Sequence, residues 1–224
     1  MSESPVTPSS RMRRRLCIAL AASGTLPMLQ GCFPLVAGGA TAVTLMAADR
    51  RTSGIYIEDE GIEWRTRDVI RQRFGNTVNV SVTSFNRNVL LTGEVPNESI
   101  RSEAGRLAEG VANVRGVINE LALGAPSSLG ARSNDTLITS KVRTRFVENR
   151  TPGSQHVKVV TEAGTVFLLG IVTRTEADAA TQIARTTAGV MKVVRVFEYI
   201  SDEEAVRLDG LPKAENPPGN TGHN

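Results

Sequence analysis

The chain has 224 residues, of which 40% are hydrophobic, 4% aromatic and 22% charged, and its formal net charge is +3. The positive charge comes from the first 31 residues, which hold four arginines and one glutamate. Without them, 22 basic and 22 acidic side chains remain, so the net charge is zero and a strongly basic nucleic-acid-binding protein is disfavoured. Two histidines and two cysteines leave little for metal or nucleophile chemistry. We therefore expect no catalytic residue, no metal site and no small-molecule substrate.

The N-terminus has the pattern of a secretory signal. Residues 11–15 are Arg-Met-Arg-Arg-Arg, and a charge-free stretch extends from Leu16 to Leu29. A basic head followed by a short apolar segment is typical of a signal peptide, and the segment is too short to span a membrane comfortably. We predict a signal peptide at residues 1–31, with translation starting at Met1 or Met12.

The end of this segment, Leu29-Gln30-Gly31-Cys32, resembles the lipobox of bacterial lipoproteins. The resemblance implies a diacylglycerol on the Cys32 thiol, cleavage before that residue and an acyl chain on the new amine, with no other cofactor. The alternative is an ordinary secretory signal with an incidental cysteine. Because Phe33 rather than Asp follows the cysteine, the resemblance also implies sorting to the outer membrane, on its periplasmic face. Residues 32–60 are then a lipidated tether and N-terminal segment.

An internal repeat organises the rest of the chain. Residues 89–95, Val-Leu-Leu-Thr-Gly-Glu-Val, return 77 positions later at 166–172 as Val-Phe-Leu-Leu-Gly-Ile-Val. Upstream, Ile-Arg-Gln-Arg-Phe at 70–74 returns at 142–146 as Val-Arg-Thr-Arg-Phe, 72 positions on. So many apolar positions in the same order indicate two copies of one unit.

Each copy has the pattern helix, strand, strand, helix, strand, which predicts an α+β fold made of two small αββαβ domains. The elements expected in the first copy are Ile62–Phe74, Val78–Val82, Val89–Val95, Ser99–Val111 and Val117–Leu123. Those expected in the second copy are Thr136–Glu148, Val157–Thr161, Val166–Val172, Thr175–Ala188 and Lys192–Ile200.

The domain boundaries follow from composition. We assign residues 61–123 to the first domain, 124–133 to a linker, 134–200 to the second domain and 201–224 to a disordered tail.

Four positions and one short segment carry local expectations. Asn134 or Asp135 is the expected N-cap of the second domain's first helix. Gly93 and Gly170 mark places where the backbone flexes or approaches a neighbour. The alternation at 55–57 suggests an added edge strand.

The repeat resembles the BON domain, through Gly-x-Val, an Ala about fifteen residues on, Val-x-x-Val and a closing strand. Two such units behind a lipobox resemble the dual-BON outer-membrane lipoproteins, the division- and outer-membrane-stress-associated lipid-binding proteins. The matching segments are 134–136, 141–143, 159–172 and 197–200. The resemblance implies a mixed three-stranded sheet with two helices in each domain. It also implies a non-enzymatic periplasmic protein that binds anionic phospholipid and supports envelope integrity.

The helix predicted at Thr136–Glu148 is the candidate for lipid contact. At about 100° per residue, Ile138, Val142 and Phe146 share one side and are expected in the core. An apolar side chain among cations can insert between headgroups while Lys and Arg meet phosphates. The candidate lipid-binding residues lie opposite the core or flank it: Leu137, Lys141, Arg143, Thr144, Arg145 and Val147.

The sequence is also compatible with a second function. The runner-up is a periplasmic adaptor that binds envelope proteins rather than lipid, with the same helix as a protein contact. Trp64 is a candidate interface residue, although partial burial as a packing residue is favoured. His156, which precedes a strand, is interpreted as a turn residue because metal or catalytic partners are lacking in the sequence.

Overall fold

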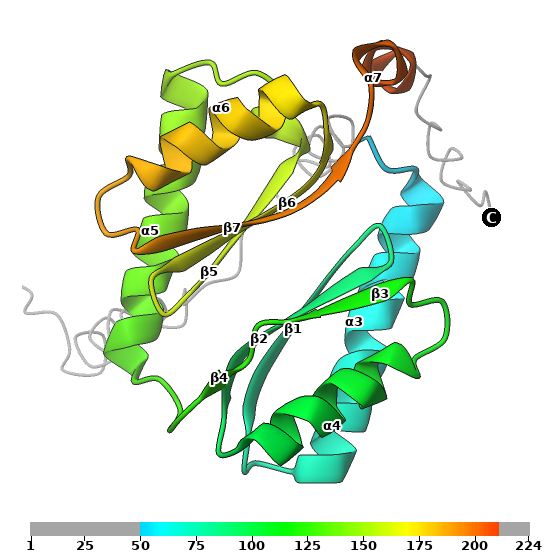
Figure 1. Ribbon diagram of the computed structural model, residues 1–224, viewed down its shortest axis with the longest axis vertical. Helices are drawn as coiled ribbons and strands as arrows, with labels where there is room; N and C mark the ends of the chain where they lie inside the picture. The colour runs from blue at the N-terminus through cyan, green and yellow to red at the C-terminus, as the bar shows by residue number, and fades with distance from the viewer. Residues whose placement is uncertain (1–49, 211–224) are drawn as a thin grey trace, which may run out of the picture. The chain divides into compact units, whose positions relative to one another are not determined.

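The computed structural model describes residues 50–210, which all belong to one compact unit (Figure 1). The predicted signal peptide, the lipobox at Cys32, most of the tether and the last part of the tail lie outside the described residues.

The first domain contains one sheet and two helices. Its elements are α3 (Ser53–Phe74), β1 (Asn79–Phe85), β2 (Asn88–Val95), α4 (Glu98–Glu109), β3 (Gly116–Asn119) and β4 (Ala122–Leu123). β1 is antiparallel to β2, whereas β3 and β4 are parallel to it. Ile62 and Ile70 of α3 pack with Ala104 and Ala108 of α4 against the sheet residue Leu91, so both helices cover the same core.

The second domain repeats this arrangement. It contains α5 (Leu129–Glu148), the 3₁₀ turn η1 (Ser154–His156), β5 (Val157–Glu162), β6 (Thr165–Val172), α6 (Arg174–Arg185), β7 (Lys192–Tyr199) and α7 (Asp202–Asp209). The strand order is β5-β6-β7, with β5 antiparallel and β7 parallel to β6. The predicted α+β fold of two tandem αββαβ units is confirmed.

A carboxylate in each first helix fixes the following hairpin. Asp59 of α3 accepts hydrogen bonds from the backbone N–H groups of residues 86–87 at 2.8 and 2.7 Å. Asp135 of α5 does the same for residues 163–164, both at 2.9 Å. These turns contain non-glycine residues with positive φ, and the carboxylate compensates by satisfying turn N–H groups that the ladder leaves unpaired.

The start of α5 differs from the prediction. The helix begins at Leu129, and its N-cap is Ser128, whose hydroxyl accepts from the N–H three residues on at 3.2 Å. Asn134 and Asp135 are inside the helix, so the expected N-cap is wrong, and residues 129–133 are helical rather than part of a linker. The composition suggested a loop, but a serine cap followed by Leu-Gly-Ala-Arg is compatible with a helix.

Three further segments differ from expectation. Residues 55–57 belong to the first turns of α3, capped by Thr52, and not to an edge strand. The single strand expected at 117–123 is divided into β3 and β4, because Leu121 turns into the core with 2% exposure. Residues 202–209 form α7 instead of disordered chain, since three acidic residues in its first turn and the Ser201 cap favour a helix start.

The two domains share a second core. Phe85 and Leu90 of the first sheet are buried in one cluster with Phe167, Leu169 and Ile171 of the second. Helices cover one face of each sheet and this cluster covers the other, which explains why β2 and β6 are buried along almost their whole length. The two domains therefore pack against each other within one unit.

Candidate functional site

The outer face of α5 carries three exposed apolar side chains. Leu129 is 81% exposed, Leu137 59% and Val147 77%. Leu129 and Val147 are 18 residues apart, which is about five helical turns, so they lie on one line parallel to the helix axis. Leu137 is rotated from that line by about 80° around the axis. Together they form an apolar stripe about 27 Å long on one side of the helix. Sequence reasoning missed Leu129, because it placed the start of the helix seven residues later.

The opposite side of α5 fixes its orientation. Ile138 and Val142 are fully buried and Phe146 is 3% exposed, in the helix-facing core of the second domain. The prediction that these three residues are core is confirmed. Their burial leaves the stripe facing outward, away from the sheet.

Three hydroxyls within the stripe bond back to the helix itself. The hydroxyl of Ser133 donates to the Leu129 carbonyl, that of Thr136 to the Arg132 carbonyl, and that of Ser140 to the Thr136 carbonyl, each at 3.0 Å. A hydroxyl bonded back to its own helix loses little when water is removed from its surroundings. The face between the apolar side chains therefore has a low cost of dehydration.

Cations flank this face. Lys141 and Arg143 are exposed, and Arg143 uses one N–H to donate to the Val159 carbonyl of β5 at 3.3 Å. Of the two carboxylates on α5, Asp135 is buried against the hairpin turn and only Glu148 is exposed. We call this surface of α5, with the stripe and its flanking cations, the α5 face.

Arg145 has an internal role in this structure. Its guanidinium donates to the Ile183 carbonyl at 3.0 Å and to the hydroxyls of Thr186 and Thr187 at 3.1 and 2.9 Å. It thereby ties α5 to the C-terminal end of α6. Of the predicted contact residues, Leu137, Lys141, Arg143, Thr144 and Val147 are exposed on α5, and Arg145 is half-buried.

The first domain presents a different surface on α3. Ile57 is 70% exposed and Trp64 is 69% exposed, two turns apart on one side of the helix. The expectation that Trp64 is a packing residue is wrong. The charges beside it are paired, since Arg65 donates to Glu58 at 2.6 Å and, further along α3, Arg71 lies 2.9 Å from Asp68.

Glu162 of β5 lies beside the N-terminal half of α5, in a hollow that Arg132 and Asp135 also line. Burial raises the pKa of Glu162, and the neighbouring negative charges of Glu94 and Asp135 raise it further. In residues 50–210, no group of His, Cys, Asp and Glu has an arrangement suited to a metal ion. None of the helices in the same residues combines the length and apolar character needed to cross a bilayer.

The fold and the repeat match a known family. The family model of the BON domain matches residues 64–125 and again 134–201. An outer membrane lipoprotein of Haemophilus influenzae, DolP, is 38% identical over 190 residues, which cover 84% of this chain and 96% of that protein. The chain belongs to the family of dual-BON outer-membrane lipoproteins. The predicted localisation to the outer membrane is thereby confirmed.

More distant relatives share the same region. A 21 kDa hemolysin of Actinobacillus pleuropneumoniae is 33% identical over 154 residues, covering 68% of this chain and 79% of its own length. Osmotically-inducible protein Y of Escherichia coli is 28% identical over 144 residues, which cover 62% of this chain and 72% of that protein.

Proposed function

We propose that this lipoprotein binds anionic phospholipid through the α5 face of its second BON domain, without catalysing a reaction, and supports envelope integrity. The observation that carries the proposal is the apolar stripe of α5, bordered by Lys141 and Arg143, with the hydroxyls of Ser133, Thr136 and Ser140 bonded back to their own helix. Such a face can lie in the headgroup region with its apolar groups inserted and its cations against phosphates.

The contrast with α3 explains the preference for the second domain. α3 also exposes apolar side chains, but its basic residues are paired with carboxylates and the acidic Glu60 is exposed nearby. An anionic surface attracts each cation near it by about 1 kcal/mol and repels carboxylates. The α5 face gains from this attraction, whereas the α3 surface gains little.

A weak contact suffices for this function if the chain is anchored. Arg50, the first described residue, is 18 positions after Cys32. A tether of this length spans at most about 60 Å when extended, so it holds the domains at high effective concentration beside the bilayer. The α5 face then selects lipid charge and orients the domains rather than supplying the anchorage.

Vesicle binding tests the α5 face. The protein used is the chain from residue 32 with Cys32→Ser, so that no acyl chain contributes. Leu137→Glu removes an inserted side chain, worth about 1–2 kcal/mol, and adds a repelled charge, worth about 1 kcal/mol. We expect its binding to phosphatidylglycerol vesicles in co-sedimentation to weaken about thirtyfold or more, with unchanged circular dichroism.

Two matched variants locate the contact. Val206→Glu changes a residue of α7 that is 74% exposed, and Trp64→Glu changes the exposed tryptophan of α3. Both are expected to bind vesicles as the parent does, and purely zwitterionic vesicles are expected to bind poorly. Equal vesicle binding by the parent and Leu137→Glu would contradict the proposal.

The second candidate function is a protein-interaction adaptor. The specific observation in its favour is the pair Ile57 and Trp64 on α3, because exposed aromatic and aliphatic side chains beside paired charges are typical of protein contacts. If the parent ignores anionic vesicles and Trp64→Glu loses binding to a purified envelope protein, this function replaces lipid binding.

Acylation of Cys32 is a further part of the proposal. Mass spectrometry of the N-terminal peptide is expected to show a diacylglycerol and an additional acyl chain on residue 32. In cells, Cys32→Ser is expected to move the protein from the outer-membrane fraction to the soluble periplasm, because each buried methylene of the anchor contributes about 0.8 kcal/mol. Membrane retention of this variant in high salt would contradict the anchor.

A further inference from the structure

β7 is a long edge strand. It ends the order β5-β6-β7, and none of the other strands in residues 50–210 pairs with its outer side. It has eight residues, contains no proline and is continuous. Proteins usually protect such edges by shortening or breaking the strand, because the free N–H and C=O groups accept another chain.

The corresponding edge of the first domain is protected. There the last strand is only four residues long and is followed by a break before β4. Asn119 occupies the position in β3 that Arg195 occupies in β7. Its side-chain amide donates to the Arg101 carbonyl of α4 at 2.8 Å, and the Arg101 guanidinium donates to the Asn119 carbonyl at 3.4 Å. These contacts close the space between α4 and β3.

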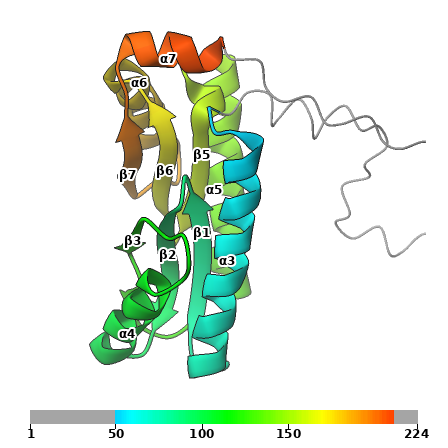
Figure 2. The same ribbon diagram turned by 90° about the vertical axis from the view of Figure 1, so that its right-hand side faces the viewer.

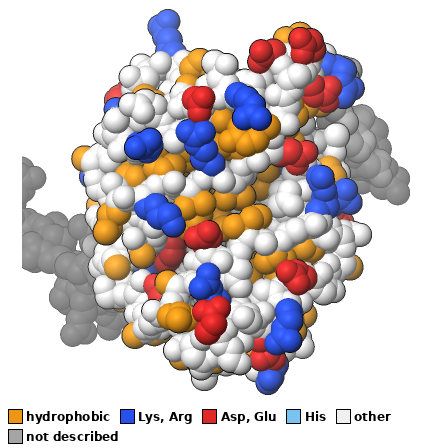
Figure 3. Space-filling model, viewed as in Figure 1, with side chains coloured by type: hydrophobic (Ala, Val, Ile, Leu, Met, Phe, Trp, Pro, Cys, Tyr) orange, Lys and Arg blue, Asp and Glu red, His pale blue; other side chains and the backbone are white. Residues whose placement is uncertain are grey.

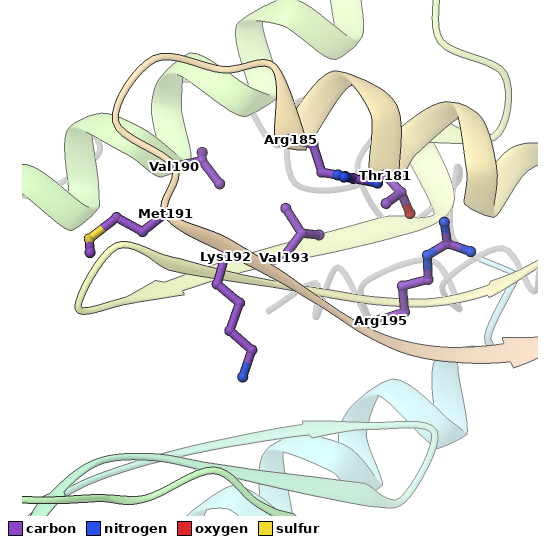
Figure 4. Close-up of a pocket in the computed structure, with 7 residues that line it drawn as sticks. All are labelled: Thr181, Arg185, Val190, Met191, Lys192, Val193 and Arg195. Carbon is purple, nitrogen blue, oxygen red and sulfur yellow. The ribbon is translucent and has the colours of Figure 1, made fainter.

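In the second domain the space between helix and edge strand is open. A hollow of about 500 Å³ is lined by Thr181 and Arg185 of α6 and by residues 190–193 and Arg195 at β7. Figure 4 shows Arg185, Thr181 and Arg195 grouped beside Val193 on the α6 side of β7, while Lys192 points away from α6 on the other side of the strand. Met191, at the end of the hollow, is 84% exposed.

Basic side chains outnumber acidic ones around this edge, where Glu198 of β7 lies 3.5 Å from Arg115 of the first domain. Lys and Arg side chains gather over α6 and β7 in Figure 3, with apolar side chains exposed between them. Arg195 contacts Asp178 at 2.9 Å, but both are well exposed, and no ion pair of residues 50–210 involves Arg185 or Lys192. Positive charge along an edge disfavours pairing with a basic segment and complements an acidic one.

We propose that β7 is a docking edge for an extended, acidic segment of a partner protein, which adds to the second sheet as a further strand. Main-chain hydrogen bonds to the β7 edge supply the register. Alternate side chains of the added segment then lie over the hollow, where glutamates or aspartates meet Arg185 and Arg195, and the apolar side chains between them point to the opposite face of the sheet. None of these residues belongs to the α5 face, so lipid binding and strand addition use separate surfaces.

The test uses a defined probe rather than a natural partner. A capped ten-residue peptide of alternating glutamate and valine is titrated into the chain from residue 32 with Cys32→Ser, without lipid. We expect amide shifts confined to β7 and α6 by NMR, and at least fivefold slower hydrogen exchange for the outward-facing β7 amides. The double variant Arg185→Glu/Lys192→Glu, which changes two exposed side chains, is expected to bind the peptide at least tenfold more weakly.

Controls separate strand addition from charge alone. Arg106→Glu, which changes an exposed arginine of α4, is expected to leave peptide binding intact. An alternating glutamate–proline peptide, which has half the N–H groups, is expected not to protect the β7 amides.

Three results would overturn the proposal. They are equal binding of a lysine–valine peptide, no shift of β7 at millimolar peptide, and protection of the β7 edge by a second copy of the chain before peptide is added. The double variant is expected to bind anionic vesicles as the parent does, because the α5 face and the β7 edge are separate surfaces. Loss of vesicle binding in this variant would assign Arg185 and Lys192 to lipid contact instead.

Discussion

Gly93→Ala is expected to destabilise the first domain by about 4 kcal/mol. Gly93 of β2 has φ +107°, a conformation that costs a residue with a side chain about 1–3 kcal/mol. In addition, a Cβ built there lies 2.1 Å from the Asn79 carbonyl oxygen on the paired strand β1, so the two strands must separate. Overpacking of this kind costs about 1–3 kcal/mol more. Urea unfolding followed by circular dichroism measures the loss.

Two other glycines separate the cost of the positive φ from the cost of the steric clash. Gly75 also has a positive φ, +60°, but a Cβ there meets nothing within 4 Å, so Gly75→Ala reports backbone strain alone. Gly170, the counterpart of Gly93 in β6, has its Cβ position 2.7 Å from the His156 carbonyl and so reports mainly the close approach. Each is expected to cost less than Gly93→Ala. A loss below 1 kcal/mol for Gly93→Ala would show that the strands yield easily and that the glycine is not required.

The same glycines show how much the sequence could predict. Their place in the repeat predicted a close approach of the backbone, and the structure confirms it for both, because the pattern of a strand pair is local and regular. The core residues Ile138, Val142 and Phe146 were predictable for the same reason, since helical spacing decides which side is buried.

Residues whose position depends on where a helix starts or on a single side-chain contact were not predictable. Leu129 joined the α5 face only because Ser128 starts the helix earlier than composition suggested. Trp64 lies on the outer side of α3, where a single aromatic gives no periodic signal. Arg145 follows the same spacing as its neighbours, yet its guanidinium reaches three acceptors at the end of α6, which no sequence pattern indicates.

The largest feature that the sequence did not predict is the ion cluster at Arg50, the first described residue. The Arg50 side chain is 2% exposed and donates to both carboxylate oxygens of Glu176 at 2.6 and 2.9 Å. It also donates to both oxygens of Asp209, each at 2.9 Å, and to the Ile171 carbonyl at 3.0 Å. The partners belong to α6, α7 and β6, so one side chain joins the end of the tether to three elements of the second domain. In Figure 2 the start of the blue segment and α7 lie at the same end of the molecule.

The cluster controls the ionisation of its carboxylates. Burial opposes the charge of Glu176, but the hydrogen bonds from Arg50 and from the Thr173 backbone outweigh it and lower the pKa of Glu176. Burial likewise opposes the charge of Arg50, and its bonds to Asp209 and Glu176 outweigh that effect and raise its pKa. Because the folded state holds Glu176 charged at a pH where the unfolded state binds a proton, this stability is present above the ordinary carboxyl pKa and is lost as the pH falls.

Arg50→Met is therefore expected to destabilise the second domain by about 3 kcal/mol near neutral pH. Removal of one partner of a buried pair costs about 3–5 kcal/mol, and the lower end applies because Asp209 stays 44% exposed and is solvated by water. The double variant Arg50→Met/Glu176→Gln is expected to regain part of the loss, since no buried charge is then left without its partner. Urea unfolding across the acid range is expected to show a weaker loss of stability on acidification in Arg50→Met than in the parent. Equal acid sensitivity of the two proteins would mean that Glu176 is held charged by the Thr173 backbone alone, and that the end of the tether is not locked to the domain through Arg50.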